Sequence, residues 1–380
     1  MIEAKMKLPR FYQNLENYLE KGKVLLIYGS RQVGKTTLLS EFLSKTGLKY
    51  KLANGDDIRT QEVLSSSDFS KILEYVSDFE LLAIDEAQRI PNIGLGLKII
   101  VDQKPDIFVI ATGSSSFESA GQTGEPLTGR KKTLILFPLS QIELSNTYNN
   151  FELKEKLPQW LVFGGYPAVL TEEKKDDKIT ILNEIVNSYL LKDVLELEKV
   201  KGSKILLDLL RLLAFQVGSE VSLSEFGRQL AIDSKTVSRY LDLLEKSFVL
   251  FNLRGYAKNL RKEITKKSKY YFYDNGIRNA IISNFNDLNL RDDVGKLFEN
   301  FLVSERLKNQ SYNKIFANNY FWRTWDKQEI DWIEEREGKL FGFEFKWTES
   351  KSRSLKSFMD NYGNTETKTV NRENYLEFIK

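Results

Sequence analysis

Short apolar runs separated by helix-like stretches characterise the first 140 residues of the chain. The runs "KVLLIYG" (23–29), "LLAID" (81–85) and "DIFVIATG" (106–113) are each nearly continuous rather than alternating. A strand that is buried on both faces has this character, and such strands occur in parallel sheets covered by helices. The pattern therefore predicts an α/β fold with a parallel sheet core in this part of the chain.

The pattern changes to helical periodicity between residues 203 and 256. "SKILLDLLRLLAFQVG" is apolar around much of its circumference, as expected of a buried helix. In the next helix, Ser222 and Glu225 have the spacing of a capping box, and Asp233 or Ser234 caps the one after. Two short helices joined by a tight turn and followed by a β-rich stretch predict a winged-helix segment.

The second of these short helices has one apolar face, formed by Val237, Leu241 and Leu244. Polar and basic side chains therefore point outward, and residues 254–269, "RGYAKNLRKEITKKSK", add a basic stretch directly behind the helix. A wing with this charge suits a phosphate backbone. Packing or dimerisation is an equally weighted alternative for a winged helix in an ATPase. The outward residues are Lys235, Thr236, Ser238 and Arg239.

A third pattern, alternation with a period of two, occurs in "EIDWIEEREGKLFGFEFKW" (329–347) and predicts two strands around a turn. Glu329 and Asp331 are expected on one side of the first strand, and Glu344 and Lys346 on one side of the second. A helix is predicted at 295–307, with Glu299 beside its apolar face.

Composition limits the chemistry that these patterns can support. The chain of 380 residues is long enough for two or three domains, and its 41% hydrophobic and 29% charged residues are ordinary for a globular protein. It contains neither cysteine nor histidine, which excludes disulfides, thiol nucleophiles, Ser-His catalysis and Cys- or His-ligated metals. Carboxylates, lysine, hydroxyls and a hard cation such as Mg²⁺ remain. The net charge of +3, with its basic excess in residues 251–380, permits contact with nucleic acid.

The most specific motif is "GSRQVGKT", which completes the pattern G-x-x-x-x-G-K-[ST] between an apolar run and a helix-forming stretch. Glycines allow backbone N–H groups to surround a phosphate, and the N-terminus of the following helix adds partial positive charge. Lys35 is expected to reach the β- and γ-phosphates of ATP, and the Thr36 hydroxyl to ligate Mg²⁺. The expected nucleotide-binding residues of this loop are Gly29, Ser30, Arg31, Gln32, Val33, Gly34, Lys35, Thr36 and Thr37.

Later segments supply candidate partners for this loop. Asp85 and Glu86 end the run "LLAIDE", where Asp85 suits a second Mg²⁺ contact and Glu86 can polarise the attacking water. Thr112 or Ser114, after another buried run, can contact the γ-phosphate, although a plain strand-to-loop turn is the alternative. Arg130 is a candidate arginine finger, in cis or in trans, or else an ordinary surface arginine.

Together, "GSRQVGKTTLL", "LLAIDEAQRIPN", "ATGSSSF", "LTGRKKTLILFPLS" and "GGYPAV" resemble the ATPase domain of the prokaryotic AAA/DUF4143 family. The resemblance covers roughly residues 1–200. With the patterns above, it implies four regions: an AAA-type P-loop core (1–145), a helical lid or linker (146–202), a winged helix (203–268) and a DUF4143 domain (269–380).

The last region also resembles the PD-(D/E)xK nuclease fold, through Glu299, Asp331 and the Glu344-x-Lys346 pair, although no proline precedes Asp331. In that resemblance Asp331 and Glu344 hold a metal, Lys346 stabilises the developing charge, and Glu299 contacts the metal directly or through water. The alternative is a solvated hairpin with ion pairs across its strands.

The sequence therefore predicts an ATP- and Mg²⁺-dependent AAA-type ATPase that couples its nucleotide state to a nucleic-acid-binding C-terminal domain, with DNA as the favoured partner and nuclease activity left open. The alternatives are a nucleotide-dependent regulator with a catalytically silent nuclease-like fold, and an ATPase scaffold that binds protein clients. No apolar run approaches the ~18 residues of a membrane helix, and the first residues lack an apolar signal core. We expect a cytoplasmic protein without a membrane partner, and a homo-oligomer is open.

Overall fold

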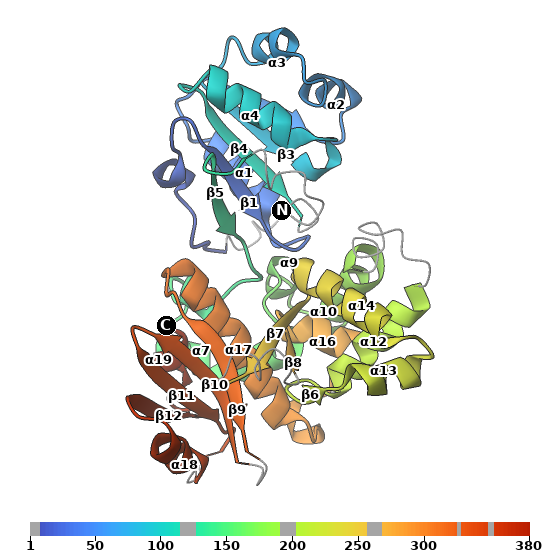
Figure 1. Cartoon of the computed structure of the whole chain (residues 1–380), viewed down its shortest axis with the longest axis vertical. Helices are drawn as coiled ribbons and strands as arrows, with labels where there is room; N and C mark the ends of the chain where they lie inside the picture. The colour runs from blue at the N-terminus through green and yellow to red at the C-terminus, as the bar shows by residue number, and fades with distance from the viewer. Residues whose placement is uncertain (1–7, 115–126, 191–202, 257–267, 325–327, 349–352) are drawn as a thin grey trace.

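The computed structural model describes residues 8–114, 127–190, 203–256, 268–324, 328–348 and 353–380. These residues form two lobes, an N-terminal lobe at the top of Figure 1 and a larger lobe, green to red, below it. None of the helices in the described part of the chain has the length and apolar character that a bilayer crossing requires.

The N-terminal lobe is built on a five-stranded sheet with the order β2-β3-β4-β1-β5, and every neighbouring pair is parallel. This confirms the parallel sheet core that the continuous apolar runs predict. The elements are η1 (Leu15–Tyr18), β1 (Val24–Tyr28), α1 (Lys35–Leu43), β2 (Tyr50–Asn54), α2 (Ile58–Leu64), α3 (Phe69–Tyr75), β3 (Leu81–Asp85), η2 (Ala87–Arg89), α4 (Ile93–Gln103), β4 (Phe108–Gly113) and β5 (Lys131–Ile135).

Both faces of this sheet are covered at its centre, which explains why the central strands β1, β3 and β4 are apolar almost throughout. Along β1, Leu26 packs into the cluster formed with α2, α3 and α4, while Leu25 and Ile27 pack with α1 on the other side. All five residues of β1 are buried. A strand in this position has no solvent face, so the sequence shows no alternation.

A helical segment connects the two lobes and leads into the second sheet. Its elements are α6 (Gln141–Leu144), α7 (Asn150–Glu155), α8 (Leu157–Phe163), α9 (Pro167–Leu170), α10 (Lys175–Glu184), η3 (Ile185–Leu190), α12 (Ser203–Phe215), β6 (Glu220–Val221), α13 (Leu223–Leu230), α14 (Ser234–Lys246), β7 (Leu250–Gly255), β8 (Ser268–Phe272), α16 (Asn275–Ile281) and η4 (Leu288–Leu290).

The caps of the two short helices differ from one another. The Asp233 side chain accepts hydrogen bonds from the amide of Thr236, at 2.9 Å, and from its hydroxyl, at 2.7 Å, so α14 is capped as the sequence predicts. The capping box predicted for α13 does not form. Ser222 occupies the N-cap position but makes no capping bond, and its hydroxyl lies 3.1 Å from that of Ser224 instead.

The remaining elements complete the second lobe: α17 (Val294–Tyr312), β9 (Asn318–Arg323), β10 (Glu329–Arg336), β11 (Lys339–Phe345), α18 (Ser354–Asn361), β12 (Thr365–Val370) and α19 (Tyr375–Ile379). β10 and β11 form the predicted antiparallel hairpin, while β12 runs parallel to β11. The turn residues Glu337 and Gly338 both have positive φ, the conformation that a two-residue hairpin turn favours.

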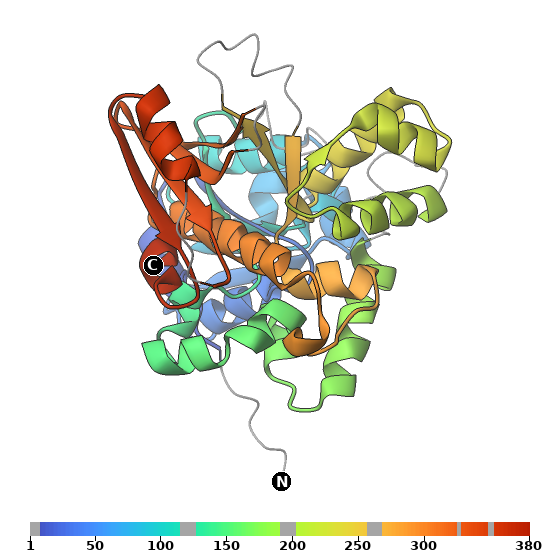
Figure 2. The ribbon, with the colours of Figure 1, turned by 90° about the horizontal axis from the view of Figure 1, so that it is seen from below.

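One mixed sheet of seven strands runs through the whole lobe, in the order β12-β11-β10-β9-β7-β8-β6. The join is the parallel pairing of β7 with β9, in which Arg254 lies opposite Tyr320 and Gly255 opposite Phe321. Helix α17 packs against both β8 and β11, and it lies between the C-terminal strands and α12–α14 in the view of Figure 2. The strands after α14 and the C-terminal hairpin therefore belong to one continuous unit.

Candidate functional site

The phosphate-binding motif forms the loop between β1 and α1, at the carboxyl end of the sheet. Gly29 passes so close to the next chain segment that a Cβ there would lie 2.1 Å from the Leu136 carbonyl oxygen. Gly34 has φ +95° and begins α1, and Gln32 also has positive φ. Successive residues of this kind turn backbone N–H groups inward, as an anion-binding loop requires.

Lys35 lies at the centre of this loop, and its side chain is buried. Its ammonium group donates hydrogen bonds to the carbonyl oxygens of Gly29, at 2.9 Å, and Ser30, at 2.8 Å. The charge is thus held where phosphate oxygens would arrive. Val33 is fully buried and anchors the loop, whereas Thr36 and Thr37 are exposed at the start of α1.

A chain of side chains joins this loop to the ends of two neighbouring strands. The Thr36 hydroxyl donates to Asp85 Oδ2 at 2.8 Å, and the buried Thr112 hydroxyl donates to Asp85 Oδ1. The backbone amide of Glu86 in turn donates to the Thr112 hydroxyl at 3.4 Å. These contacts occur because the carboxyl ends of the parallel strands β1, β3 and β4 meet at one edge of the sheet.

Glu86 has a left-handed backbone conformation, and its carboxylate contacts Gln88, a residue that the sequence did not single out. Its φ of +53° is left-handed, and its carbonyl oxygen would lie 2.1 Å from a Cβ at Gly55. Gln88 donates from its side-chain amide to the Glu86 carboxylate and accepts at 3.2 Å from the amide of Ser114. Gln88 thus orients the carboxylate expected to act on water. Its only sequence signal is its position in "LLAIDEAQ".

The structure separates Arg130 from this site. Arg130 directly precedes β5, and its carbonyl oxygen accepts from the amide of Val24 at the beginning of β1. The P-loop follows the other end of β1. The Arg130 guanidinium pairs instead with Asp102 of α4, with Nε 2.5 Å from Oδ1. In this arrangement Arg130 does not serve the phosphate site of its own chain, which removes the geometric basis for the cis alternative.

A second group of charged side chains lies where β8, α17 and β10 meet. The Lys269 side chain, 2% exposed, has its Nζ 3.5 Å from Glu299 Oε1 and also contacts Glu329. The Tyr271 hydroxyl donates to the same Glu299 oxygen at 2.7 Å. Burial alone would lower the pKa of Lys269, but the charges of Glu299, Asp331 and Glu329 raise it above its ordinary value. We call the three carboxylates Glu299, Glu329 and Asp331, together with the lysine among them, the acidic cluster.

Asp331 lies in an irregularity of the hairpin. The register between β10 and β9 shifts by one residue between Ile330 and Ile333, which is a β-bulge containing Asp331. Its Oδ2 accepts from the amide of Phe345 at 2.7 Å. Burial, followed by the charge of Glu299, raises the pKa of Asp331 well above its usual range.

Glu344 and Lys346 form a pair with each other, with Lys346 Nζ 2.8 Å from Glu344 Oε1. The carboxylates of the sequence-predicted metal site are therefore bonded to cations, a tyrosine or a backbone amide of the chain. Nowhere in the described residues do three acidic side chains form an arrangement that could hold a metal ion. Burial alone would lower the pKa of Lys346, but its bond with Glu344 and the charges of Asp331 and Glu299 raise it. The structure therefore brings together the four residues that the sequence singled out in this domain.

Three family models match successive parts of the chain. Residues 21–145 match an AAA domain, residues 154–288 match DUF8612 and residues 294–376 match DUF4143, the last two being domains of unknown function. The chain carries an AAA domain and a DUF4143 domain. The P-loop, Asp85 and Thr112 all lie within the AAA domain, and the hairpin lies within the DUF4143 domain.

Relatives align with nearly the whole chain. An uncharacterized protein of Mycobacterium tuberculosis is 28% identical over 349 residues, covering 90% of this chain and 75% of its own. One of Haemophilus influenzae is 25% identical, covering 95% of this chain and 93% of its own. One of Methanocaldococcus jannaschii is 23% identical, covering 94% and 82%.

Among solved structures, the Thermotoga maritima RuvB Holliday junction branch migration motor matches with a TM-score of 0.26 and 17% identity, over 60% of this chain and 81% of the motor. A variant of the same motor matches with a TM-score of 0.30 and 16% identity, with the same coverage.

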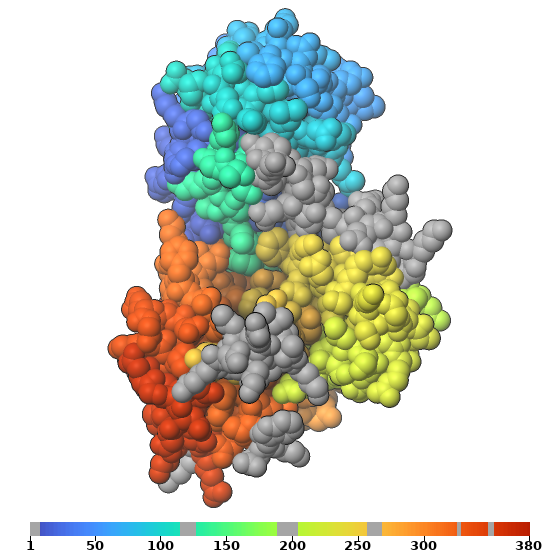
Figure 3. Space-filling view, in the orientation of Figure 1, coloured from blue at the N-terminus to red at the C-terminus, as the bar shows by residue number. Residues whose placement is uncertain are grey.

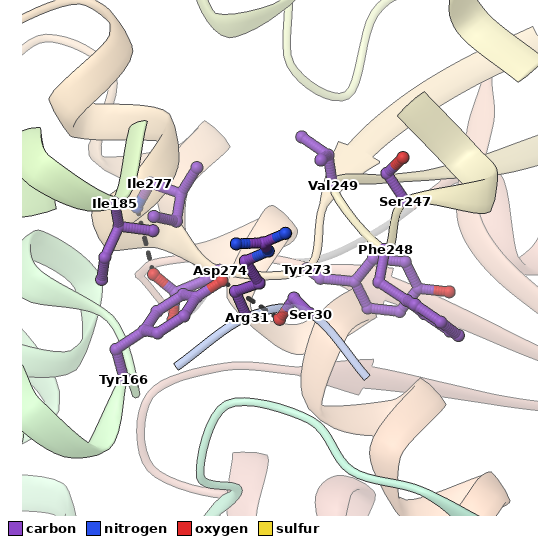
Figure 4. A pocket seen from close by; sticks show the side chains of 10 residues that line it. All are labelled: Ser30, Arg31, Tyr166, Ile185, Ser247, Phe248, Val249, Tyr273, Asp274 and Ile277. Atoms are coloured by element: carbon purple, nitrogen blue, oxygen red, sulfur yellow. Dashed lines mark hydrogen bonds between the residues drawn. The ribbon is translucent and has the colours of Figure 1, made fainter. Parts of the chain in front are cut away.

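The AAA domain meets the second lobe at a small pocket beside the P-loop (Figure 4). Ser30 and Arg31 line it from the loop, while Tyr166, Phe248 and Asp274 line it from the other lobe. The Tyr166 hydroxyl donates to Ser30 Oγ at 3.2 Å. Burial raises the pKa of Tyr166, and so, to a lesser degree, does the nearby charge of Asp274. Sequence reasoning missed this contact, which joins residues 136 positions apart.

Proposed function

We propose that the AAA domain binds and hydrolyses ATP with Mg²⁺, and that its nucleotide state controls binding of nucleic acid by the second lobe. The observation that carries the first part is the continuous contact from Thr36, the residue after the buried Lys35, through Asp85 to Thr112. Side chains from three segments of the chain meet where phosphate oxygens would lie. This is the arrangement that phosphoryl transfer needs, since positioning and charge stabilisation supply most of the catalysis.

The residues present suit Mg²⁺. Thr36 and Asp85 offer a hydroxyl and a carboxylate oxygen 2.8 Å apart, and both are hard oxygen donors. When bound, the ion neutralises charge on the β- and γ-phosphates. Lys35 holds the phosphates, Thr112 fixes the carboxylate of Asp85, and Glu86, oriented by Gln88, positions the attacking water.

Replacement of the P-loop lysine tests this proposal. Lys35→Ala should abolish ATP turnover, because the charge at the centre of the loop is lost. Lys45→Ala is the matched control, because Lys45 is exposed near the end of the same helix and pairs locally, with Glu41 at 2.6 Å. Phosphate release is measured for both purified variants. Normal ATP hydrolysis by Lys35→Ala refutes the role.

We assign nucleic-acid binding to a winged helix formed by α12, β6, α13, α14, β7 and β8. Two observations support this assignment: β8 pairs antiparallel with both β6 and β7, and α14 exposes one side of its length. The exposed residues include Lys235, Ser238 and Arg239, while Val237 and Leu241 are buried. This part of the chain, in yellow, lies at the surface in Figure 3. The basic residues Lys266 and Lys267, expected in the wing, lie outside the described residues.

A charge reversal on this face separates DNA binding from a packing role. Lys235→Glu combined with Arg239→Glu should weaken duplex DNA binding and flatten its salt dependence, by about 0.9 in log–log slope for each phosphate that the protein no longer neutralises. Lys246→Glu is the control, at the far end of α14, where Lys246 pairs with Asp242 at 2.7 Å. Fluorescence anisotropy at several salt concentrations gives the slopes. Equal slopes for the double variant and the wild type would leave only packing or dimerisation.

The pocket between the lobes supports the coupling. Ser30 of the P-loop and Tyr166 of the helical segment are hydrogen-bonded across it, so a phosphate arriving at the loop acts directly on a contact with the second lobe. Affinity for DNA is therefore expected to differ between the ATP-bound and nucleotide-free protein.

We assign a PD-(D/E)xK-like fold to the C-terminal elements. The order α17, β9, β10, β11, α18, β12, with β12 parallel to β11, supports this. A homo-oligomer remains part of the proposal, because Arg130 is distant from its own phosphate site and can act as an arginine finger only on a neighbouring subunit.

A further inference from the structure

The acidic cluster contains a cation that belongs to the chain itself. Lys269 Nζ lies against Glu299 and Glu329, and the ammonium also lies 5.2 Å from the centre of the Phe321 ring. Glu299 and Glu329 come from α17 and β10, whereas Lys269 comes from β8, the strand that follows the basic stretch 257–267. The cation therefore reaches the DUF4143 domain from the preceding part of the chain.

We propose that Lys269 is the permanent cation of the acidic cluster, so that the DUF4143 domain uses its carboxylates as an internal ionic lock and holds no divalent metal there. The nuclease-like fold then serves as a rigid binding platform, fixed to the strand behind the winged helix. This proposal depends only on contacts within the second lobe, and it is independent of the proposed ATP hydrolysis.

The backbone around Lys269 keeps it in place. β8 is paired on both edges, with Lys269 opposite Leu253 of β7 on one side and Glu220 of β6 on the other. Tyr271 and Phe272 of the same strand are fully buried. The backbone of Lys269 is therefore fixed, and its side chain, 2% exposed, is enclosed beside the carboxylates.

One oxygen of each carboxylate that a metal would use is already engaged within the chain. Glu299 Oε1 takes part in contacts with both Lys269 and the Tyr271 hydroxyl, and Asp331 Oδ2 accepts from a backbone amide. Glu344 pairs with Lys346. A divalent ion would have to replace these bonds and remain close to a fixed positive charge, which opposes its binding.

A Mn²⁺ titration of the full chain tests the proposal. All proteins carry Asp85→Asn, which removes the metal contact of the P-loop, and binding is followed by calorimetry with Mn²⁺ alone. We expect no specific Mn²⁺ site in this background. Adding Lys269→Met removes the cation but keeps an apolar stem of similar length, and should create a Mn²⁺ site that a further Asp331→Asn removes. Lys269→Arg keeps the charge and should create none.

Two results overturn the proposal. One is Mn²⁺ binding by the protein with Lys269 intact that is lost with Asp331→Asn. The other is a folded Lys269→Met protein that gains no site. If Lys269→Met does not fold, the proteins with and without Asp331→Asn, both with Lys269 intact, still decide the question. A cleavage assay on DNA and RNA with Mg²⁺ or Mn²⁺, with and without ATP, adds an independent readout: cleavage that depends on Asp331 overturns the proposal, and its absence supports it.

Discussion

Thr112→Val tests the hydroxyl that joins Asp85 and Glu86 in the proposed catalytic site. Threonine and valine have nearly the same shape, so the substitution removes the hydroxyl and leaves the packing of β4 intact. The substitution removes the bond that the Thr112 hydroxyl donates to the Asp85 carboxylate, and also the longer bond, 3.4 Å, that it accepts from the Glu86 amide. The first of these, to a charged group, is expected to dominate. Thr112 is fully buried, so water does not replace this donor without rearrangement.

The magnitude follows from the charge of the acceptor. A hydrogen bond to a charged group contributes about 1.5–3 kcal/mol. If this free energy acts on the position of Asp85 in the transition state, turnover falls by roughly 10- to 150-fold, since 1.36 kcal/mol corresponds to a factor of ten. Because Thr112 does not line the P-loop itself, we expect the loss mainly in kcat rather than in KM for ATP.

The assay is steady-state phosphate release over a range of ATP concentrations. Thr112→Ser, which keeps the hydroxyl, should recover most of the activity. Thr60→Val is the matched control, because the buried Thr60 hydroxyl lies 3.1 Å from the Tyr75 hydroxyl, away from the site. It should cost stability without changing turnover. A Thr112→Val protein that retains turnover within twofold of wild type would refute the role assigned to this contact.

Three further predictions concern stability. Tyr166→Phe removes the bond to the P-loop and should lower the free energy of unfolding by about 1 kcal/mol. The control Tyr375→Phe removes a buried hydroxyl that has no hydrogen-bond partner among the described residues, and it should change little. Equal losses of the two variants in urea denaturation would contradict this. Glu334→Gln should lower the free energy of unfolding by about 3–5 kcal/mol, because buried Arg306 loses the carboxylate that it contacts at 2.5 and 2.9 Å. Thermal and urea unfolding measure this loss of stability. A loss below about 1 kcal/mol would refute the argument. Burial opposes ionisation of Asp293, but hydrogen bonds and charges of two arginines lower its pKa to about 2. This carboxylate therefore stabilises the fold above pH about 4 and loses that contribution as the pH falls towards 2. Asp293→Asn should flatten this part of the pH profile of unfolding, and an unchanged profile would count against the prediction.

Local patterns determined those parts of the fold that depend on neighbouring residues. The continuous apolar runs predicted the parallel sheet, because strands covered on both faces need no polar side. The alternating pattern predicted the hairpin of β10 and β11, and Asp233 was correctly identified as a possible cap of α14. The capping box at Ser222 was wrong, because two hydroxyl groups of the same turn contact each other instead.

In the P-loop the sequence alone specified Gly29, Gly34, Lys35 and Thr36, since their spacing along one loop sets the geometry. Partners from other segments required the tertiary structure. Thr112 meets Asp85 from 27 positions away because β3 and β4 are adjacent in the sheet, and Arg130 is excluded from its own site because it lies at the opposite end of β5. Strand order is not encoded in any local pattern.

The C-terminal hairpin illustrates the same limit most clearly. The spacing of Asp331, Glu344 and Lys346 is a property of the sequence, and it predicted a metal site. The tertiary structure brings in Lys269, 62 positions before Asp331, because the pairing of β7 with β9 merges two sets of strands into one sheet. The sequence determined which carboxylates share the hairpin, but only the fold decided which cation lies among them, since ionic contacts depend on distance in space rather than on separation along the chain.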